Sequence, residues 1–115
     1  MPALWLAFLN SWRGLRHGAK TERAVRLELA LLFLGLPLAF VLGETLWIRV
    51  ALVASLLVML AAEFLNTAIE KLCDHLHPVH HPAIGIVKDL ASAGAFLAQA
   101  VAALVWLAAI LDRIG

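Results

Sequence analysis

Charged residues are scarce in this chain of 115 residues. Asp, Glu, Lys and Arg make up 15% of it, 63% of the residues are hydrophobic, and the mean hydropathy is +0.93. Soluble domains carry about a quarter of their residues as charged side chains, and a domain of this size leaves much of its surface exposed. A water-soluble fold could not hide this much apolar surface, so the composition predicts a single membrane-embedded domain over residues 1–115.

Cysteine is almost absent as well. Cys73 is the single one, so an intrachain disulfide and a Cys-rich metal site are excluded. The thiol is expected to pack as a small hydrophobe. A cleaved signal peptide is not expected either, because the apolar stretch 4–9 is short and comes before the basic residues.

The basic residues are concentrated near the amino terminus. Of nine Lys and Arg residues, five lie in the first 26 positions: Arg13, Arg16, Lys20, Arg23 and Arg26. Such a cluster beside a span holds this end in the cytoplasm and attracts anionic lipid headgroups. Nucleic-acid binding is not expected, because most of the remaining chain is lipid-soluble.

Three apolar stretches predict membrane-spanning helices. They lie within residues 27–43, 46–72 and 88–112. A span needs about 20 mostly apolar residues. The first stretch is slightly short and contains Pro37, so we expect it to tilt or to kink.

The breaks between these stretches predict how the spans are connected. The short break at 43–45 predicts a tight hairpin, with Arg49 reaching back to the outer surface. The segment 71–88 is expected to connect the second and third spans on the cytoplasmic side. Three crossings then leave Asp112 and Arg113 outside.

Residues 3–24 predict an amphipathic surface helix before the first span. Leu4, Phe8, Trp12 and Leu15 have the spacing of one helical face, and basic residues lie between them. A helix of this kind lies in the membrane interface. A loose tail is the alternative.

Acidic and amide side chains form a stripe at the end of the second span. At about 100° per residue, Glu63, Asn66 and Glu70 fall on one helical face. Asp74 extends that face by a turn. Carboxylates within a span are costly and usually face a partner, a cavity or an ion. We therefore expect a functional cluster, and the alternative is a structural ion pair with Lys88 or an amino-terminal arginine.

The stripe suits both magnesium binding and proton transfer. Mg²⁺ prefers one or two carboxylates together with substrate phosphates, and Glu70 and Asn66 could provide these oxygens. Glu63 lies higher in the span, where it could take a proton from a lipid hydroxyl arriving from the bilayer. Lys88, at the start of the third span, could neutralise phosphate charge, and the adjoining helix amino terminus favours anions.

Two further acidic residues and a histidine-rich loop complete the candidates. Glu28 lies near apolar residues and could join the cluster, whereas Glu22 lies among basic residues, where a surface salt bridge is the alternative. The loop histidines are His75, His77, His80 and His81. Their spacing matches no common zinc site, so nucleotide contact or a plain interfacial loop is expected.

These motifs resemble those of the prokaryotic integral-membrane diacylglycerol kinases. The residues that carry the resemblance are Glu63-x-x-Asn66-Thr67-Ala68-Ile69-Glu70, Asp74, Lys88-Asp89-x-x-Ser92-Ala93, and upstream Ser11-Trp12-Arg13-Gly14-Leu15-Arg16 and the segment 21–28. The similarity covers nearly the whole chain. The absence of a Walker loop or another Gly-rich loop is typical of a family with its own kinase chemistry.

The resemblance implies an all-α membrane fold and a set of roles. It implies a homotrimer of three-span subunits in the bacterial inner membrane, each with a surface helix, and shared sites near the cytoplasmic face. It implies Glu63 as the catalytic base and Glu22 and Glu70 as ligands of Mg²⁺. The residues implied around ATP are Glu22, Asn66, Glu70, His81, Lys88 and Asp89. Those implied around the lipid or the wider polar cluster are Trp12, Glu28 and Ser92.

Two lipid substrates and two other functions stay open at this point. The loop from His81 to Asp89 resembles the undecaprenol kinase branch, whereas Ser92 and the amino-terminal motif resemble the diacylglycerol enzymes. Phosphorylation of diacylglycerol to phosphatidic acid is therefore preferred. A membrane ion carrier that uses the acidic stripe as its path, or a structural membrane subunit, are the rivals.

Overall fold

The computed structural model describes residues 2–77, 79 and 81–115. Over these residues the chain forms four helices and no strand: α1 (Pro2–Thr21), α2 (Arg23–Leu42), α3 (Leu46–Leu76) and α4 (Pro82–Ile114). The all-α fold class is confirmed for this part of the chain. His80 of the predicted histidine-rich loop lies outside the described residues.

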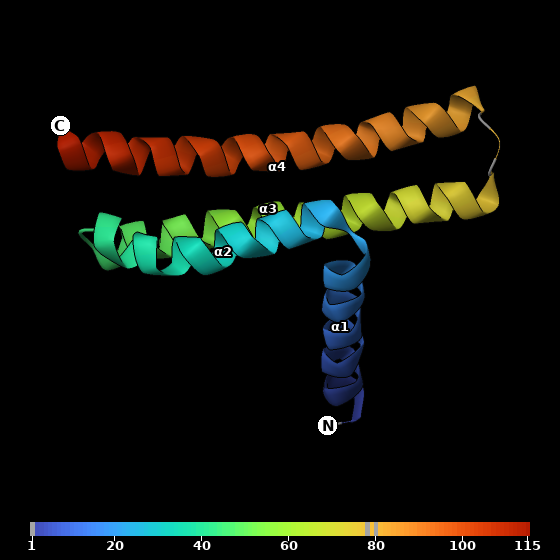
Figure 1. The fold of residues 1–115 in the computed structure, drawn as a ribbon, viewed down its shortest axis with the longest axis horizontal. Coiled ribbons are helices and arrows are strands. Elements are labelled where there is room, and N and C mark those ends of the chain that lie inside the picture. The colour runs from blue at the N-terminus through green and yellow to red at the C-terminus, as the bar shows by residue number, and fades with distance from the viewer. Residues whose placement is uncertain (1, 78, 80) are drawn as a thin grey trace.

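Helices α2, α3 and α4 are the three spans expected from the sequence. Each is long and apolar enough to cross a membrane, and their axes run side by side along the long direction of the molecule (Figure 1). Helix α2 continues through Pro37. The chain then turns within 43–45, and the side chain of Thr45 caps α3 by accepting a hydrogen bond from the backbone N–H of Ile48 at 3.2 Å. The predicted helical hairpin is confirmed.

Helix α1 lies across the bundle rather than along it. In Figure 1 it meets the bundle where α2 begins and runs across the direction of α2, while α3 and α4 extend beyond that level. Leu4, Phe8 and Trp12 on its apolar face are 67%, 60% and 54% exposed. An exposed apolar face on a helix that lies across the spans is what an interfacial helix requires, so the arrangement agrees with the predicted surface helix.

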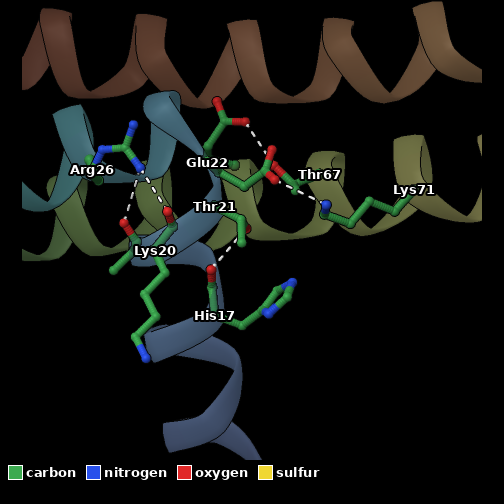
Figure 2. Close-up of polar contacts among 9 residues, drawn as sticks. His17, Lys20, Thr21, Glu22, Arg26, Thr67 and Lys71 are labelled. Carbon is green, nitrogen blue, oxygen red and sulfur yellow. Dashed lines mark hydrogen bonds and ion pairs between the residues drawn. The ribbon is translucent and has the colours of Figure 1, made fainter.

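The surface helix ends earlier than the sequence pattern predicts. Helix α1 stops at Thr21, because Glu22 adopts an extended backbone with φ −116° and ψ 119°. The side chain of Arg26 then donates hydrogen bonds to the carbonyl oxygens of Ala19 at 3.3 Å and Lys20 at 3.1 Å (Figure 2). These bonds satisfy carbonyl groups that the end of a helix leaves free, and they stabilise the bend between α1 and α2.

The connector between α3 and α4 is shorter than the predicted segment 71–88. Helix α3 runs to Leu76, and α4 begins at Pro82. The side chain of His81 accounts for the early start, since its Nδ1 accepts a hydrogen bond from the backbone N–H of Ala83 at 3.1 Å. Proline also suits the first position of a helix. Both helices therefore continue past the apolar stretches that revealed them.

Helix α3 holds the bundle together because it packs against both α2 and α4. Leu56 and Met59 of α3 and Ala102 of α4 form its buried core. Trp106 of α4 packs against this core, and its indole Nε1 donates a hydrogen bond to the carbonyl oxygen of Leu52 at 3.1 Å. This interhelical bond fixes the register of α4 against α3.

Charged residues close the end of the bundle that carries the α2–α3 turn. Arg113, near the end of α4, pairs with Glu44 at 3.3 Å. Arg49 donates a hydrogen bond from Nε to the carbonyl oxygen of Gly43 at 3.0 Å and so reaches back to the turn as expected. The carboxyl terminus and this turn therefore lie at one end, and the α3–α4 connector lies at the other (Figure 1).

Candidate functional site

Polar side chains run along α3 toward the α3–α4 connector. Glu63 is buried, and Asn66, Thr67 and Glu70 are half-buried. Asn66 donates a hydrogen bond from Nδ2 to Glu70 Oε1 at 3.4 Å, and Thr67 donates one from Oγ1 to Glu63 Oε2 at 3.3 Å. The helical spacing therefore gives each carboxylate a partner one turn away on its own helix.

The deepest part of this region is a pair of carboxyl groups from two helices. Glu63 of α3 and Glu28 of α2 are each 7% exposed, and their carboxyl groups are neighbours. Gln99 of α4 donates a hydrogen bond from Nε2 to Glu28 Oε2 at 3.3 Å. Side chains from all three spans therefore meet at Glu28.

Two oxygen atoms in this cluster have no partner. Asn66 Oδ1 and Glu28 Oε1 are buried without a hydrogen bond to the described residues. Buried polar atoms are nearly always paired in folded proteins. These two oxygens are therefore acceptors that remain available for a further hydrogen bond.

An ion pair joins α3 to α4 beside the connector. Lys88 Nζ lies 2.6 Å from Asp74 Oδ1, so the structural alternative considered for the stripe holds for Asp74. The rings of His77 and His81 lie nearby with their centroids 4.9 Å apart, and all four residues line a polar hollow of about 220 Å³. Because α4 begins earlier than predicted, Lys88 and Asp89 lie inside the helix rather than at its opening.

Glu22 reaches α3 from the bend between α1 and α2. Its Oε2 lies 3.0 Å from Lys71 Nζ (Figure 2). The hydrogen bond from Lys71 lowers the pKa of Glu22, with a smaller lowering from Thr21, so the carboxylate stays ionised at neutral pH. The sequence predicted a salt bridge from Glu22 to a basic residue near it in the chain. A salt bridge is present, but its partner is Lys71 of α3. Lys71 follows Glu70 directly, so Glu22 reaches the same turn of α3 as Glu70.

The candidate magnesium ligands are oxygen donors with separate contacts. Glu22 pairs with Lys71, and Glu70 accepts a hydrogen bond from Asn66. Within the described residues, no three His, Cys, Asp or Glu side chains gather around one point. Mg²⁺ needs only one or two protein carboxylates when phosphates and water complete its shell. Two carboxylates and the unpaired Asn66 oxygen fit that chemistry.

Three sequence-based candidates do not join the buried cluster. Trp12 is exposed on α1, and Asp89 and Ser92 are exposed on α4. Their roles stay predictions. His81 is partly accounted for by capping α4.

Sequence reasoning missed Gln99, Thr67 and Lys71 as members of this region. A signal for Gln99 exists, because a polar side chain inside an apolar span is costly and needs a partner. Thr67 lies four residues after Glu63, a spacing at which helical side chains meet. For Lys71 the sequence holds no signal, since its partner Glu22 lies in a distant segment.

Known proteins similar to this chain share one description. The sequence pattern of the family "Prokaryotic diacylglycerol kinase" matches residues 9–110. The chain is 36% identical over 96 residues to the diacylglycerol kinase of Haemophilus influenzae, which covers 84% of this chain and 81% of that one. It is 34% identical over 96 residues to the diacylglycerol kinase of Escherichia coli K12, covering 84% and 79%. It is 33% identical over 99 residues to that of Pseudomonas aeruginosa, covering 86% and 75%.

Proposed function

Because the chain belongs to the prokaryotic diacylglycerol kinase family, we propose that it transfers the γ-phosphate of ATP to the hydroxyl of diacylglycerol. The products are phosphatidic acid and ADP. Membership of the family and the three apolar helices make the chain a multi-pass membrane protein of lipid-kinase type.

The observation that carries the proposal is a continuous polar ladder on α3. It begins at the buried Glu63, continues through Asn66 and Glu70, and ends at the exposed Asp74–Lys88 pair. One end therefore lies among apolar helices, which suits a lipid alcohol, and the other opens to water, which suits a nucleotide. Phosphoryl transfer depends mainly on positioning and charge stabilisation, and such a ladder supports both.

We assign Glu63 as the general base. Its carboxylate takes the proton of the lipid hydroxyl while the hydroxyl oxygen attacks the γ-phosphorus and the bond from that phosphorus to ADP breaks. Thr67 holds one oxygen of Glu63, and Glu28 lies beside it as a group able to share the proton. The burial of Glu63 supports a substrate that arrives from the lipid rather than from water.

We assign the nucleotide to the water-facing half of the ladder. Lys88 neutralises phosphate charge, and Asn66 presents an unpaired oxygen. Glu22 and Glu70 are assigned to Mg²⁺, which when bound neutralises phosphate charge. Lys71 pairs with Glu22 in this structure, so Glu22 would have to give up that ion pair in order to hold the metal. The full set assigned to nucleotide and metal is Glu22, Asn66, Glu70, His81, Lys88 and Asp89.

Diacylglycerol is the preferred lipid because the relatives named above are diacylglycerol kinases. Ser92 and the amino-terminal motif also favour diacylglycerol. We assign Trp12, Glu28 and Ser92 to the part of the site that receives the lipid substrate. Undecaprenol stays the alternative substrate, because the loop 81–89 resembles that of the undecaprenol kinase branch. Both are lipid alcohols, so the assigned chemistry is the same for either.

We further propose a homotrimer in the bacterial inner membrane with its amino terminus in the cytoplasm. The basic residues of α1 and its bend support this orientation. Large apolar side chains are exposed on all three spans, and these need lipid or neighbouring copies to cover them. In a trimer, the site would face the cytoplasm near a subunit boundary.

Radiolabelled ATP provides the direct test. The purified protein in mixed micelles is given Mg²⁺ with either diacylglycerol or undecaprenol, and the labelled lipids are separated. Labelled phosphatidic acid that disappears when EDTA is added would support the proposal. Label on undecaprenol alone would select the alternative, and label on neither lipid would contradict lipid kinase activity.

A further inference from the structure

A single amide interrupts an otherwise apolar groove between α2 and α4. The groove has a volume of about 400 Å³, and among the described residues that line it Gln99 alone carries an amide or a charge. Its neighbours there include Leu31, Gly35 and Met59. A polar side chain within an apolar span is costly unless it is bonded, so Gln99 is expected to have a polar partner.

Helix packing does not account for this amide. Ala95 and Ala102, each one turn from Gln99 on α4, are buried, and Ala102 belongs to the core that α4 shares with α3. Gln99 instead directs its Nε2 to Glu28 Oε2 at 3.3 Å. The contact joins α4 to α2, two helices that otherwise touch little.

The bond controls a carboxyl group that lies against the assigned base. Glu28 and Glu63 are both buried, and their carboxyl groups are neighbours. Gln99 holds Oε2 of Glu28, which leaves Oε1 without a partner among the described residues. One oxygen is thus held from α4, and the orientation of the whole carboxyl group follows from that bond.

We propose that Gln99 is a positioning residue for phosphoryl transfer, acting through Glu28 on Glu63. The inference rests on the proposed function and extends it to a residue outside the family motifs quoted above. Thr67 fixes Glu63 from within α3, whereas Gln99 fixes the partner of Glu63 across two helices. Without Gln99, Glu28 would keep its burial but lose its orientation, so proton transfer would suffer more than nucleotide binding.

A double-mutant cycle separates this role from a merely structural one. Gln99→Leu removes the donor at similar size, and Glu28→Ala removes its acceptor. Val101→Leu, at an exposed position on the same helix, is the matched control. The readouts are kcat and KM for Mg-ATP in micelles with saturating lipid.

We expect Gln99→Leu to lower kcat about tenfold and to change KM for Mg-ATP less than about twofold. In the Glu28→Ala background the same substitution should change kcat less than about twofold, because its partner is gone. Val101→Leu should match the parent. If Gln99→Leu does not fold, Gln99→Asn, which keeps a shorter amide, should show the same pattern with a smaller loss.

Each contrary result is distinct. An unchanged kcat in Gln99→Leu, or an equal loss in both backgrounds, would overturn this inference while the kinase activity of the parent stands. A parent that phosphorylates no lipid would overturn the proposed function, and the inference with it.

Discussion

The carboxylate of Glu22 lies 3.0 Å from the ammonium of Lys71, and this ion pair ties the bend between α1 and α2 to α3 (Figure 2). The surface helix is therefore anchored to the helix that carries Glu63 and Glu70. Because an interfacial helix follows the membrane surface, we expect the pair to hold the candidate site at a fixed depth relative to that surface.

This ion pair should make stability depend on pH in acid. The hydrogen bond from Lys71 lowers the pKa of Glu22. A carboxyl group whose pKa is lower in the folded state adds stability above its unfolded pKa and loses it as the pH falls through the folded pKa. Lys71→Gln should therefore lower the thermal midpoint at neutral pH, and the difference from the parent should shrink as Glu22 is protonated.

Thermal scans in micelles from neutral pH into the acid range measure this difference. Lys20→Gln, which removes an exposed charge from α1, is the control and should show a smaller effect at neutral pH. A difference for Lys71→Gln that persists unchanged in acid would show that Lys71 acts through some other contact.

Gly18 should be intolerant of a side chain because α1 passes close to α3 at this point. A Cβ atom there would lie 2.6 Å from Phe64 Cε1. Overpacking costs about 1–3 kcal/mol, and a shift of the ring would place Gly18→Ala near the lower figure. Gly14→Ala, where no atom lies within 4 Å, should instead stabilise the helix by up to about 1 kcal/mol. Because both glycines lie in α1 and gain the same helix propensity, unfolding followed by circular dichroism should show Gly18→Ala to be less stable than Gly14→Ala, and equal shifts would contradict the close approach.

The indole of Trp106 should contribute more than its apolar surface. Trp106→Phe removes the hydrogen bond to the carbonyl oxygen of Leu52 and should cost about 0.5–1.5 kcal/mol. Trp47→Phe, at a side chain that is 82% exposed, is the matched control and should be nearly neutral. Comparable losses of stability for both substitutions would show that the hydrogen bond from Trp106 to Leu52 does not stabilise the fold.

The sequence predicts the spans well because their signal is local. Apolar stretches of sufficient length define α2, α3 and α4, and the break at 43–45 defines the hairpin. The ladder on α3 is also local, because helical periodicity alone places Glu63 and Glu70 on one face.

The parts that escaped prediction depend on contacts between distant segments. Gln99 meets Glu28 from another helix, and residue spacing cannot show such a pairing. Helix α1 ends at Thr21 partly because Arg26 folds back onto its carbonyl groups. The early start of α4 depends on a cap from His81, and the sequence pattern predicts an irregular loop at that position rather than the start of a helix.

Magnesium dependence should be specific to the ladder. Glu70→Gln removes a negative charge from the assigned metal site and should raise the Mg²⁺ concentration for half-maximal activity about tenfold or more. Glu44→Gln, at the opposite end of the bundle and paired with Arg113, makes the same chemical change and should leave that concentration unaltered. A titration of activity against Mg²⁺ measures this concentration for both variants. An unchanged concentration for Glu70→Gln would show that Glu70 is not a metal ligand.

The rate of phosphate transfer to lipid by Glu63→Gln, compared with the parent and with Glu44→Gln, tests the central claim most directly. Loss of a general base costs about 10²–10⁴-fold in rate, so Glu63→Gln should lose nearly all turnover while its helical content and assembly are retained. Glu44→Gln should turn over at the parental rate. Near-parental turnover by a folded Glu63→Gln protein would contradict the assignment of Glu63 as the base on which this account depends.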